Sequence, residues 1–313
     1  MRVIFRGVRG SLPAPLTPEQ VRSKIAAVVQ RIRPGDLQSA ESRERFLSRL
    51  PPYLFGTTGG NTTCVEVRTD DERLLILDGG TGLRVLGAAL AQRRDPTREF
   101  PLLLTHFHWD HLQGIPFFGP AWVKGNRLTF VSPDPSMEKT VREQMRPPYF
   151  PVTMEAMQAE VRFLCLKGEK ARFGNAEIRW RKMNHPGGVY AYRISENGKS
   201  LVFATDSEVT ERDFISQGEG RSFFERADLL ILDSQYTLEE SFSKFDFGHT
   251  SYTMAVNLAA EWNVRRLVLF HHEPRYDDRK IFGIARRAQW HRDQLGESAL
   301  EVSTAVEGTE IVL

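Results

Sequence analysis

The sequence of 313 residues is poor in cysteine and contains no long apolar run. Cys64 and Cys165 could form one bridge at most, and each lies in an apolar run typical of a strand, so two buried free thiols are expected. No stretch approaches the roughly 18 consecutive apolar residues of a membrane-spanning helix. No export signal is visible either, so we expect a cytoplasmic protein with no membrane partner.

The chain also carries little net charge, with a formal value of +2. This leaves no large electrostatic footprint for a long polyanion, although pairs such as Arg93-Arg94 and Arg265-Arg266 remain candidate contacts. Charge alone neither demands nor excludes nucleic acid. A content of 41% hydrophobic and 26% charged residues is ordinary for a globular protein, and we expect one domain over residues 1–313.

Short β-rich runs alternate with helical patterns along most of the chain. Expected strands cover residues 2–8, 63–68, 73–77, 100–104, 161–166, 176–183, 189–194, 200–204, 229–232 and 266–270, followed by two last strands. Expected helices cover residues 83–92, 251–262 and 281–294, and another falls in the Pro- and Met-rich segment 132–159. This order predicts an α/β fold with two sheets face to face and helices outside.

Residues 14–55 look like a helical insertion between two strands. Thr17, Pro18 and Gln20 form a capping pattern that predicts a helix to about Ile32, and a second helix covers residues 40–50. The first helix has an apolar stripe that must be buried, made by Val21, Ile25, Val28, Val29 and Ile32. Packing on the sheets and contact in a homodimer both remain open.

Four side chains that can bind a metal follow the apolar strand at residues 101–104. In extended backbone, His106 and His108 face the same way and can hold one ion. Asp110 and His111 lie just beyond, where the chain must turn, and can face a second ion. A lone His-x-His pair on a strand is often surface decoration, but four such residues together favour a metal site.

Three later strands also end on a residue that can bind a metal, namely His185, Asp206 and His271. Taken singly, each could be a loop residue with local hydrogen bonds. Taken together, they complete two coordination shells. A carboxylate such as Asp206 has the two oxygens needed to bridge two cations about 3.5–4 Å apart.

The His-x-His-x-Asp-His motif with these later ligands resembles the metallo-β-lactamase superfamily, and most of all its ribonuclease Z and cyclic-phosphodiesterase branch. The resemblance covers nearly the whole chain except the insertion. It implies a four-layer αββα sandwich with the site at one edge, and two divalent ions, with Zn favoured and Mn or Fe open. It assigns His106, His108 and His185 to the first ion. It assigns Asp110, His111 and His271 to the second, with Asp206 bridging both.

The branch is indicated by Phe247-Gly248-His249-Thr250-Ser251 and by the tail that follows His271. The resemblance implies that His249 acts on the leaving group, and the alternative is that it only caps the helix starting near Ser251. It matches Asp233 to a carboxylate that orients His249, the alternative being an ordinary turn residue. It also counts Asp110 among the catalytic residues.

Three further residues receive expectations on the same grounds. Asp78 matches a strand-end aspartate that supports a ligand from behind. His272 directly follows His271 and should point to the other face of its strand. His291 lies in a charged helical segment, where we expect it to be solvated.

The expected reaction is hydrolysis of a cyclic nucleotide or another small phosphodiester by a hydroxide that bridges the metals. A ribonuclease Z type of RNA processing is the main alternative, but that branch often carries a long arm between the third histidine and the bridging aspartate. Here only twenty residues separate His185 from Asp206, so a long nucleic acid is not expected. A thioesterase or lactonase and a non-enzymatic sensor are further alternatives. Tyr149 and Phe150, in a Pro-rich loop, are candidates for stacking on a base.

Overall fold

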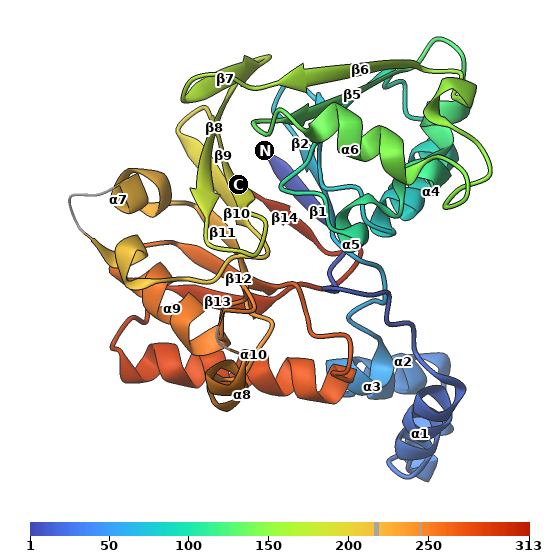
Figure 1. Cartoon of the computed structure of the whole chain (residues 1–313). Coiled ribbons are helices and arrows are strands. Elements are labelled where there is room, and N and C mark those ends of the chain that lie inside the picture. The colour runs from blue at the N-terminus through green and yellow to red at the C-terminus, as the bar shows by residue number, and fades with distance from the viewer. Residues whose placement is uncertain (216–218, 245) are drawn as a thin grey trace.

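Two seven-stranded sheets pack face to face in the computed structural model, which describes residues 1–215, 219–244 and 246–313 (Figure 1). The first sheet has the order β14-β1-β2-β3-β4-β5-β6. Its strands are β1 (Arg2–Gly7), β2 (Cys64–Arg68), β3 (Leu74–Leu77), β4 (Glu99–Leu103), β5 (Arg127–Ser132), β6 (Glu160–Cys165) and β14 (Glu310–Val312).

The second sheet has the order β13-β12-β11-β10-β9-β8-β7. Its strands are β7 (Lys170–Phe173), β8 (Ala176–Met183), β9 (Val189–Glu196), β10 (Lys199–Ala204), β11 (Leu229–Asp233), β12 (Arg266–Phe270) and β13 (Glu301–Thr304). Strands β10, β11 and β12 run parallel to one another. Their carboxyl ends therefore lie at the same edge of the sheet, which is where the candidate site forms.

The central strands β10, β11 and β12 of the second sheet are buried on both faces. Along β11, Leu229 and Ile231 pack in the core between the sheets, whereas Leu230 and Leu232 pack under the outer helices. This alternation is expected because successive side chains of a strand point to opposite faces. The result is one apolar layer between the sheets and a second beneath the helices.

Helices cover the outer faces of both sheets (Figure 1). On the first sheet lie α4 (Gly82–Arg93) and α6 (Met137–Gln144), and on the second lie α7 (Glu219–Phe224), α9 (Tyr252–Glu261) and α10 (Asp278–Gln294). This confirms the four-layer αββα sandwich. None of the helices in the described ranges is both long and apolar enough to cross a membrane. Cys64 is buried, Cys165 is only half-buried, and both are free thiols.

Strands β5 and β7 and the short helices were not predicted. β5 follows a stretch with Pro116, Pro120 and Gly125 that breaks any periodic pattern, and β7 is a four-residue edge strand without a buried residue. The helix α10 begins at Asp278 rather than near residue 281, because the side chain of Asp277 accepts a hydrogen bond from the Lys280 backbone N–H and caps it.

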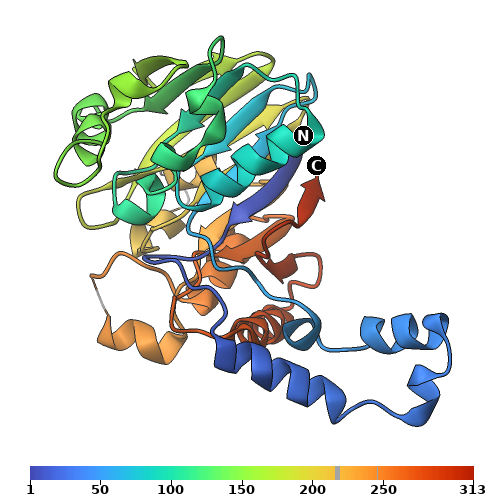
Figure 2. The ribbon, with the colours of Figure 1, turned by 90° about the vertical axis from the view of Figure 1, so that its right-hand side faces the viewer.

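The segment before β2 forms an arm of three helices, α1 (Pro18–Val29), α2 (Ala40–Ser48) and α3 (Pro52–Phe55), which projects from the sandwich (Figure 2). The capping box predicted at Thr17 is present. Of the two alternatives for the α1 stripe, packing on the sheets does not occur. No residue of α1 is buried, and Val21, Ile25 and Val29 are exposed, so the homodimer contact stays a prediction.

The arm is held to α10 through the buried carboxylate of Asp278. Its oxygens accept hydrogen bonds from the Thr58 backbone N–H at 2.9 Å, from the Thr58 hydroxyl at 2.8 Å and from the Lys24 ammonium. The Arg9 guanidinium lies 3.9 Å away and is also buried. The Asp278 carboxylate, at the start of α10, thus contacts both the arm and Arg9, which comes just after β1.

Replacing Asp278 by alanine should cost about 3 kcal/mol of unfolding free energy, because Arg9 would remain buried without its counter-charge. Urea unfolding followed by circular dichroism measures this loss. The neighbouring variant Asp277→Ala removes only an exposed helix cap and should cost about 1 kcal/mol. Equal, small losses in the two variants would contradict the role given to Asp278.

Candidate metal centre

Strand ends from both sheets bring seven histidine and aspartate side chains to one edge of the sandwich. The chain leaves β4 toward His106 and His108, and the short helix α5 (Trp109–Leu112) then carries Asp110 and His111. The residues His185, Asp206 and His271 come shortly after β8, β10 and β12. The structure brings all seven predicted ligands together in two groups.

The first group consists of three imidazoles and one carboxylate oxygen. His108 Nδ1 lies 2.9 Å from His106 Nε2 and 3.2 Å from His185 Nε2. The Oδ2 atom of Asp206 lies 3.8 Å from His106 Nε2 and 4.0 Å from His185 Nε2. His108 is the one exposed member of this group, so the group is open on that side.

The second group lies on the other side of Asp206 and is fully buried. The Oδ1 atom of Asp206 is 3.1 Å from both His111 Nε2 and His271 Nε2. The Oδ2 atom of Asp110 is 3.2 Å from His111 Nε2 and 3.3 Å from His271 Nε2. The two oxygens of Asp206 therefore face different groups.

These donor atoms fit divalent transition-metal ions. Bond lengths of about 2.0–2.1 Å in a tetrahedral site place neighbouring ligand atoms roughly 3.3 Å apart, which is close to the separations above. His111 Nε2 is also buried without a hydrogen-bond partner among the described residues, as expected for an atom that faces a cation. Three nitrogens and a carboxylate on one side, and two nitrogens and two carboxylates on the other, can each complete one shell.

The electrostatics favour the ligand forms of His106, His108, His185 and Asp206, whereas for His111 burial is outweighed by Asp206, Asp110 and Asp78, which raise its pKa well above its usual value. Burial lowers the pKa of His106, His108 and His185, which favours the neutral imidazole that binds metals. Burial raises the pKa of Asp206, but the neighbouring His111 and His271 hold it well below its usual range. Asp206 is therefore an ionised carboxylate.

The ring nitrogens that face away from the two groups are held by hydrogen bonds. His111 Nδ1 donates to Asp78 Oδ2 at 2.9 Å, and Asp78 also accepts from the backbone N–H and the hydroxyl of Thr105. His185 Nδ1 donates to the Gly248 carbonyl at 2.9 Å. These bonds select the tautomer and leave Nε2 free toward the site. The predicted position of Asp78 behind a ligand agrees with this geometry.

Three of these residues have left-handed backbone, with φ of +62° at Asp78, +47° at Asp206 and +62° at His271. Such a conformation costs about 1–3 kcal/mol for a residue with a side chain and persists only where surrounding contacts impose it. Asp78 and His271 directly follow a strand, and Asp206 follows β10 after one intervening residue. The strained turn after each strand therefore directs a candidate ligand, or in the case of Asp78 the residue that holds one, toward the site.

His249 and Asp233 form a pair beside the second group. Asp233 Oδ2 accepts from His249 Nδ1 at 2.7 Å, and Asp233 Oδ1 accepts from the backbone N–H groups of Gln235 and Thr250. The His249 ring stacks on His271 at 5.1 Å. Burial lowers the pKa of His249, but Asp233 raises it to about 9, and cations bound nearby would oppose that rise.

His249 does not cap the following helix. Ser251 is the N-cap of α9, because its hydroxyl accepts from the Met254 backbone N–H. With Nδ1 occupied by Asp233, the remaining ring nitrogen of His249 is Nε2, which is free of a hydrogen bond within the described residues. The alternative that His249 only caps this helix is therefore wrong, and its action on a leaving group stays a prediction.

Sequence reasoning missed some groups around the site. The Ser11 backbone N–H donates to Asp110 Oδ2 at 2.8 Å, and Ser11 itself has a φ of +59°. Trp109, inside the histidine motif, is 76% exposed and available to a bound molecule. The position of Trp109 inside the histidine motif could have singled it out, whereas a backbone N–H leaves no trace in a sequence.

Other expectations had mixed outcomes. His272 points away from the metals as predicted, and its Nε2 donates to the Ala305 carbonyl. The expectation that His291 is solvated was wrong, because its ring is partly buried and hydrogen-bonded to Asn257 on α9. Phe150 packs on Phe117 at 5.9 Å and on the core beneath it, so that ring is not free to stack on a base.

Residues 73–272 match the family profile described as the Beta-lactamase superfamily domain. The chain belongs to this superfamily. As a member it is an enzyme, a hydrolase built on the metallo-β-lactamase fold. The matched span contains all seven candidate ligands, together with Asp78, Asp233 and His249.

The chain is similar to curated relatives that carry the name Ribonuclease Z. That of Prochlorococcus marinus (strain NATL1A) is 26% identical over 234 residues, covering 56% of this chain and 70% of the relative. That of Salinispora arenicola (strain CNS-205) is 24% identical over 271 residues, covering 72% of this chain and 85% of the relative. Both belong to the superfamily branch that the histidine motifs resemble.

Solved structures share the fold at low sequence identity. The metallo-β-lactamase fold protein YhfI from Bacillus subtilis superposes with a TM-score of 0.65 and 18% identity, over 99% of this chain and 98% of that one. A diphosphatase of the PhnP family gives 0.65 and 14%, over 100% and 97%. The short form of human tRNase Z gives 0.59 and 16%, over 100% and 99%. These likenesses concern the fold alone.

Substituting Gly248 by alanine should remove one metal ion from this superfamily member. A Cβ there would lie 2.2 Å from His185 Nδ1, so the ring must shift and its hydrogen bond to the Gly248 carbonyl must break. Elemental analysis by mass spectrometry should give about one ion per chain fewer than in the parent protein.

A matched control is Gly187→Ala, at a residue with the same φ of +83° and nothing within 4 Å of its added Cβ. It should keep the metal content of the parent. If both variants hold the same number of ions, the contact between Gly248 and His185 does not control the site.

Proposed function

We propose that this hydrolase is a phosphodiesterase with two divalent metal ions. The observation that carries the proposal is the Asp206 carboxylate, whose two oxygens face separate groups of ligands. The first ion is assigned to His106, His108 and His185. The second ion is assigned to Asp110, His111 and His271, with Asp206 shared. Zn is the favoured metal for such a set, and Mn or Fe are the alternatives.

When two such ions are bound, they supply a nucleophile from water near neutral pH and stabilise negative charge on phosphoryl oxygens. The chain's own groups perform the remaining work. His249 gives the proton at its Nε2 to the leaving alkoxide, and Asp233 holds the ring through Nδ1. Asp110 is kept in place by the Ser11 backbone N–H, so its second oxygen remains available to water.

A small phosphodiester, such as a cyclic nucleotide, is the favoured substrate. Its support comes from the short connection between His185 and Asp206, which consists of β9, β10 and a two-residue turn at Asn197 and Gly198. No long arm for a large RNA arises there. An RNA-processing nuclease is the second candidate, because the curated relatives carry the name Ribonuclease Z.

One screen separates the two candidates. The metal-loaded protein is assayed on cyclic mononucleotides, cyclic dinucleotides and precursor transfer RNA under the same conditions. Preference for the cyclic substrates supports the first candidate, and accurate cleavage of the precursor alone supports the second.

Chelation should abolish hydrolysis of bis-p-nitrophenyl phosphate, and added Zn or Mn should restore it, because the nucleophile depends on the ions. Release of p-nitrophenolate followed by absorbance measures both steps. Robust turnover by protein shown to be free of metal would falsify the proposal.

The variants Asp206→Ala and His249→Ala should differ in what they lose. Asp206→Ala removes the shared ligand, so bound metal and activity should fall together. His249→Ala should keep both ions and lose about 10²–10⁴-fold in kcat, since a proton donor is not a ligand. Metal analysis beside steady-state kinetics gives the comparison, and equal metal loss in the two variants would show that His249 is misassigned.

A further inference from the structure

The exposed face of α10 concentrates positive charge. This helix has five Arg or Lys residues against two Asp residues, whereas the whole chain has a formal charge of only +2. None of the seven candidate ligands lies on it. Since α10 accounts for a net charge of about +3, the rest of the protein is close to neutral, and α10 carries more Arg and Lys residues than any other described helix or strand.

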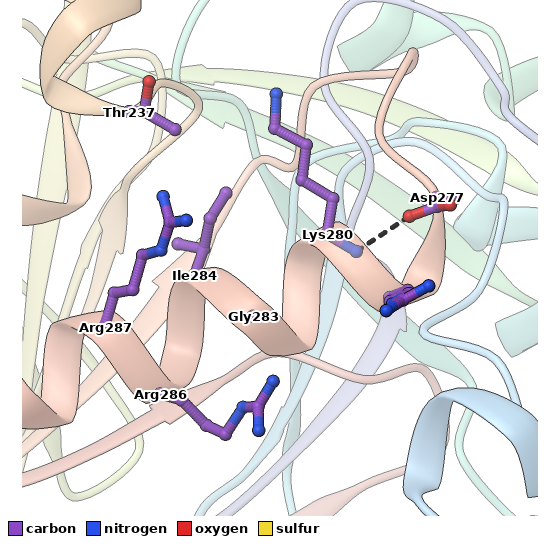
Figure 3. A pocket seen from close by; sticks show the side chains of 8 residues that line it. Thr237, Asp277, Lys280, Gly283, Ile284, Arg286 and Arg287 are labelled. Carbon is purple, nitrogen blue, oxygen red and sulfur yellow. Dashed lines mark hydrogen bonds between the residues drawn. The ribbon is translucent and has the colours of Figure 1, made fainter.

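A groove of about 560 Å³ runs along this face and is bounded by Thr237, at the start of α8 (Leu238–Ser243). Figure 3 shows Lys280, Ile284 and Arg287 on one side of Gly283 and Arg286 on the other. Arg279 also lines the groove. Cationic side chains thus flank a stretch of bare helix backbone.

Most of these cations have no protein partner. Lys280 is bonded to Glu240 at 2.8 Å and lies 3.6 Å from the centre of the Tyr276 ring. Within the part of the chain that the structure describes, the guanidinium groups of Arg279, Arg286 and Arg287 make neither an ion pair nor a hydrogen bond. They are free to bind an anion from solution.

No contact within the described structure requires a glycine at position 283. A glycine in a helix interior is less stable than alanine there, and a Cβ added to Gly283 would meet nothing within 4 Å. The helix would accept a side chain at this position, but that side chain would fill the part of the groove that Gly283 lines. The glycine therefore fits a ligand that approaches the backbone between the arginines.

The spacing of the cations indicates the kind of ligand. Arg279 and Arg287 are separated by about 12 Å along the helix axis, at a rise of 1.5 Å per residue, so the cations are spread along the groove and are not gathered at one point. This spacing favours a ligand with several phosphates in a row. Trp290, one turn beyond Arg286, is 63% exposed and offers a face on which an unpaired base can stack.

We propose that this groove binds the phosphodiester backbone of a short single-stranded oligonucleotide. Arg279, Arg286 and Arg287 contact phosphates along the strand, and Trp290 stacks on a base. Thr237 follows Asp233 by four residues, which places the two within about 14 Å of each other. Hydrolysis of the same strand rests on the proposed phosphodiesterase function, but its binding in the groove does not.

The test measures binding of a fluorescein-labelled single-stranded RNA octamer by fluorescence anisotropy at several salt concentrations. The full-length, metal-loaded His249→Ala protein is the background, so that the strand stays intact. The double variant Arg286→Ala/Arg287→Ala should weaken binding at low salt and reduce the slope of log Kd against log salt by about 1.4, since each lost phosphate contact contributes about 0.7 for a single strand.

The matched control is Arg43→Ala/Arg45→Ala in α2, which removes the same charge from exposed positions away from the groove. It should bind like the parent. Equal weakening in the two double variants would overturn the proposal, because binding would then follow net charge alone. Binding of uridine monophosphate as tight as that of the octamer would overturn the strand in favour of a single-phosphate site.

Gly283→Leu adds an independent check. Because its side chain meets no protein atom at Cβ, the melting temperature should stay level or rise, while binding of the octamer falls several-fold. Unchanged octamer affinity in this variant would overturn the groove as the binding site. Absence of hydrolysis by the metal-loaded protein with His249 in place, while the octamer still binds, would instead count against the phosphodiesterase and leave the groove in place.

Discussion

The rest of the site depends on a single buried carboxylate, that of Asp206. It lies 3.1 Å from His111 and His271 on one side and 3.8 Å from His106 on the other. Burying an anion costs several kcal/mol unless positive charge is close on the sides that water would have occupied. The surrounding donors are therefore arranged for cations, and ion binding and local folding are expected to be coupled.

The sandwich makes this arrangement possible because several strands end at the same edge. Parallel β10, β11 and β12 deliver Asp206, Asp233 and His271 to neighbouring positions, and β4 on the facing sheet leads to the histidine motif. Apolar layers on both faces of the second sheet fix the strands and leave the strained turns no freedom to relax. The apolar packing of the core thus offsets the energetic cost of the left-handed backbone at the site.

The sequence was informative where function needs a distinctive side chain. The seven candidate ligands could be found because each is a histidine or aspartate, placed either in the dense motif that follows β4 or shortly after a later strand. Supports such as the Gly248 carbonyl and the Ser11 N–H could not, since every residue has these groups and only the fold decides which ones face the site. The exposure of Ile25 was also hidden, because an amphipathic stripe looks the same whether or not the chain covers it.

The helical arm leaves and rejoins the sandwich at nearly the same point, where the Ala14 backbone N–H donates to the Gly60 carbonyl at 2.8 Å. A Cβ on Gly60 would lie 2.8 Å from the Ala14 carbonyl oxygen, so the two strands of chain are in direct contact. A segment with joined ends can lengthen, shorten or be exchanged at little entropic cost to the body that carries it. The arm can therefore change in length between these two points without moving the strands that lead to the catalytic edge.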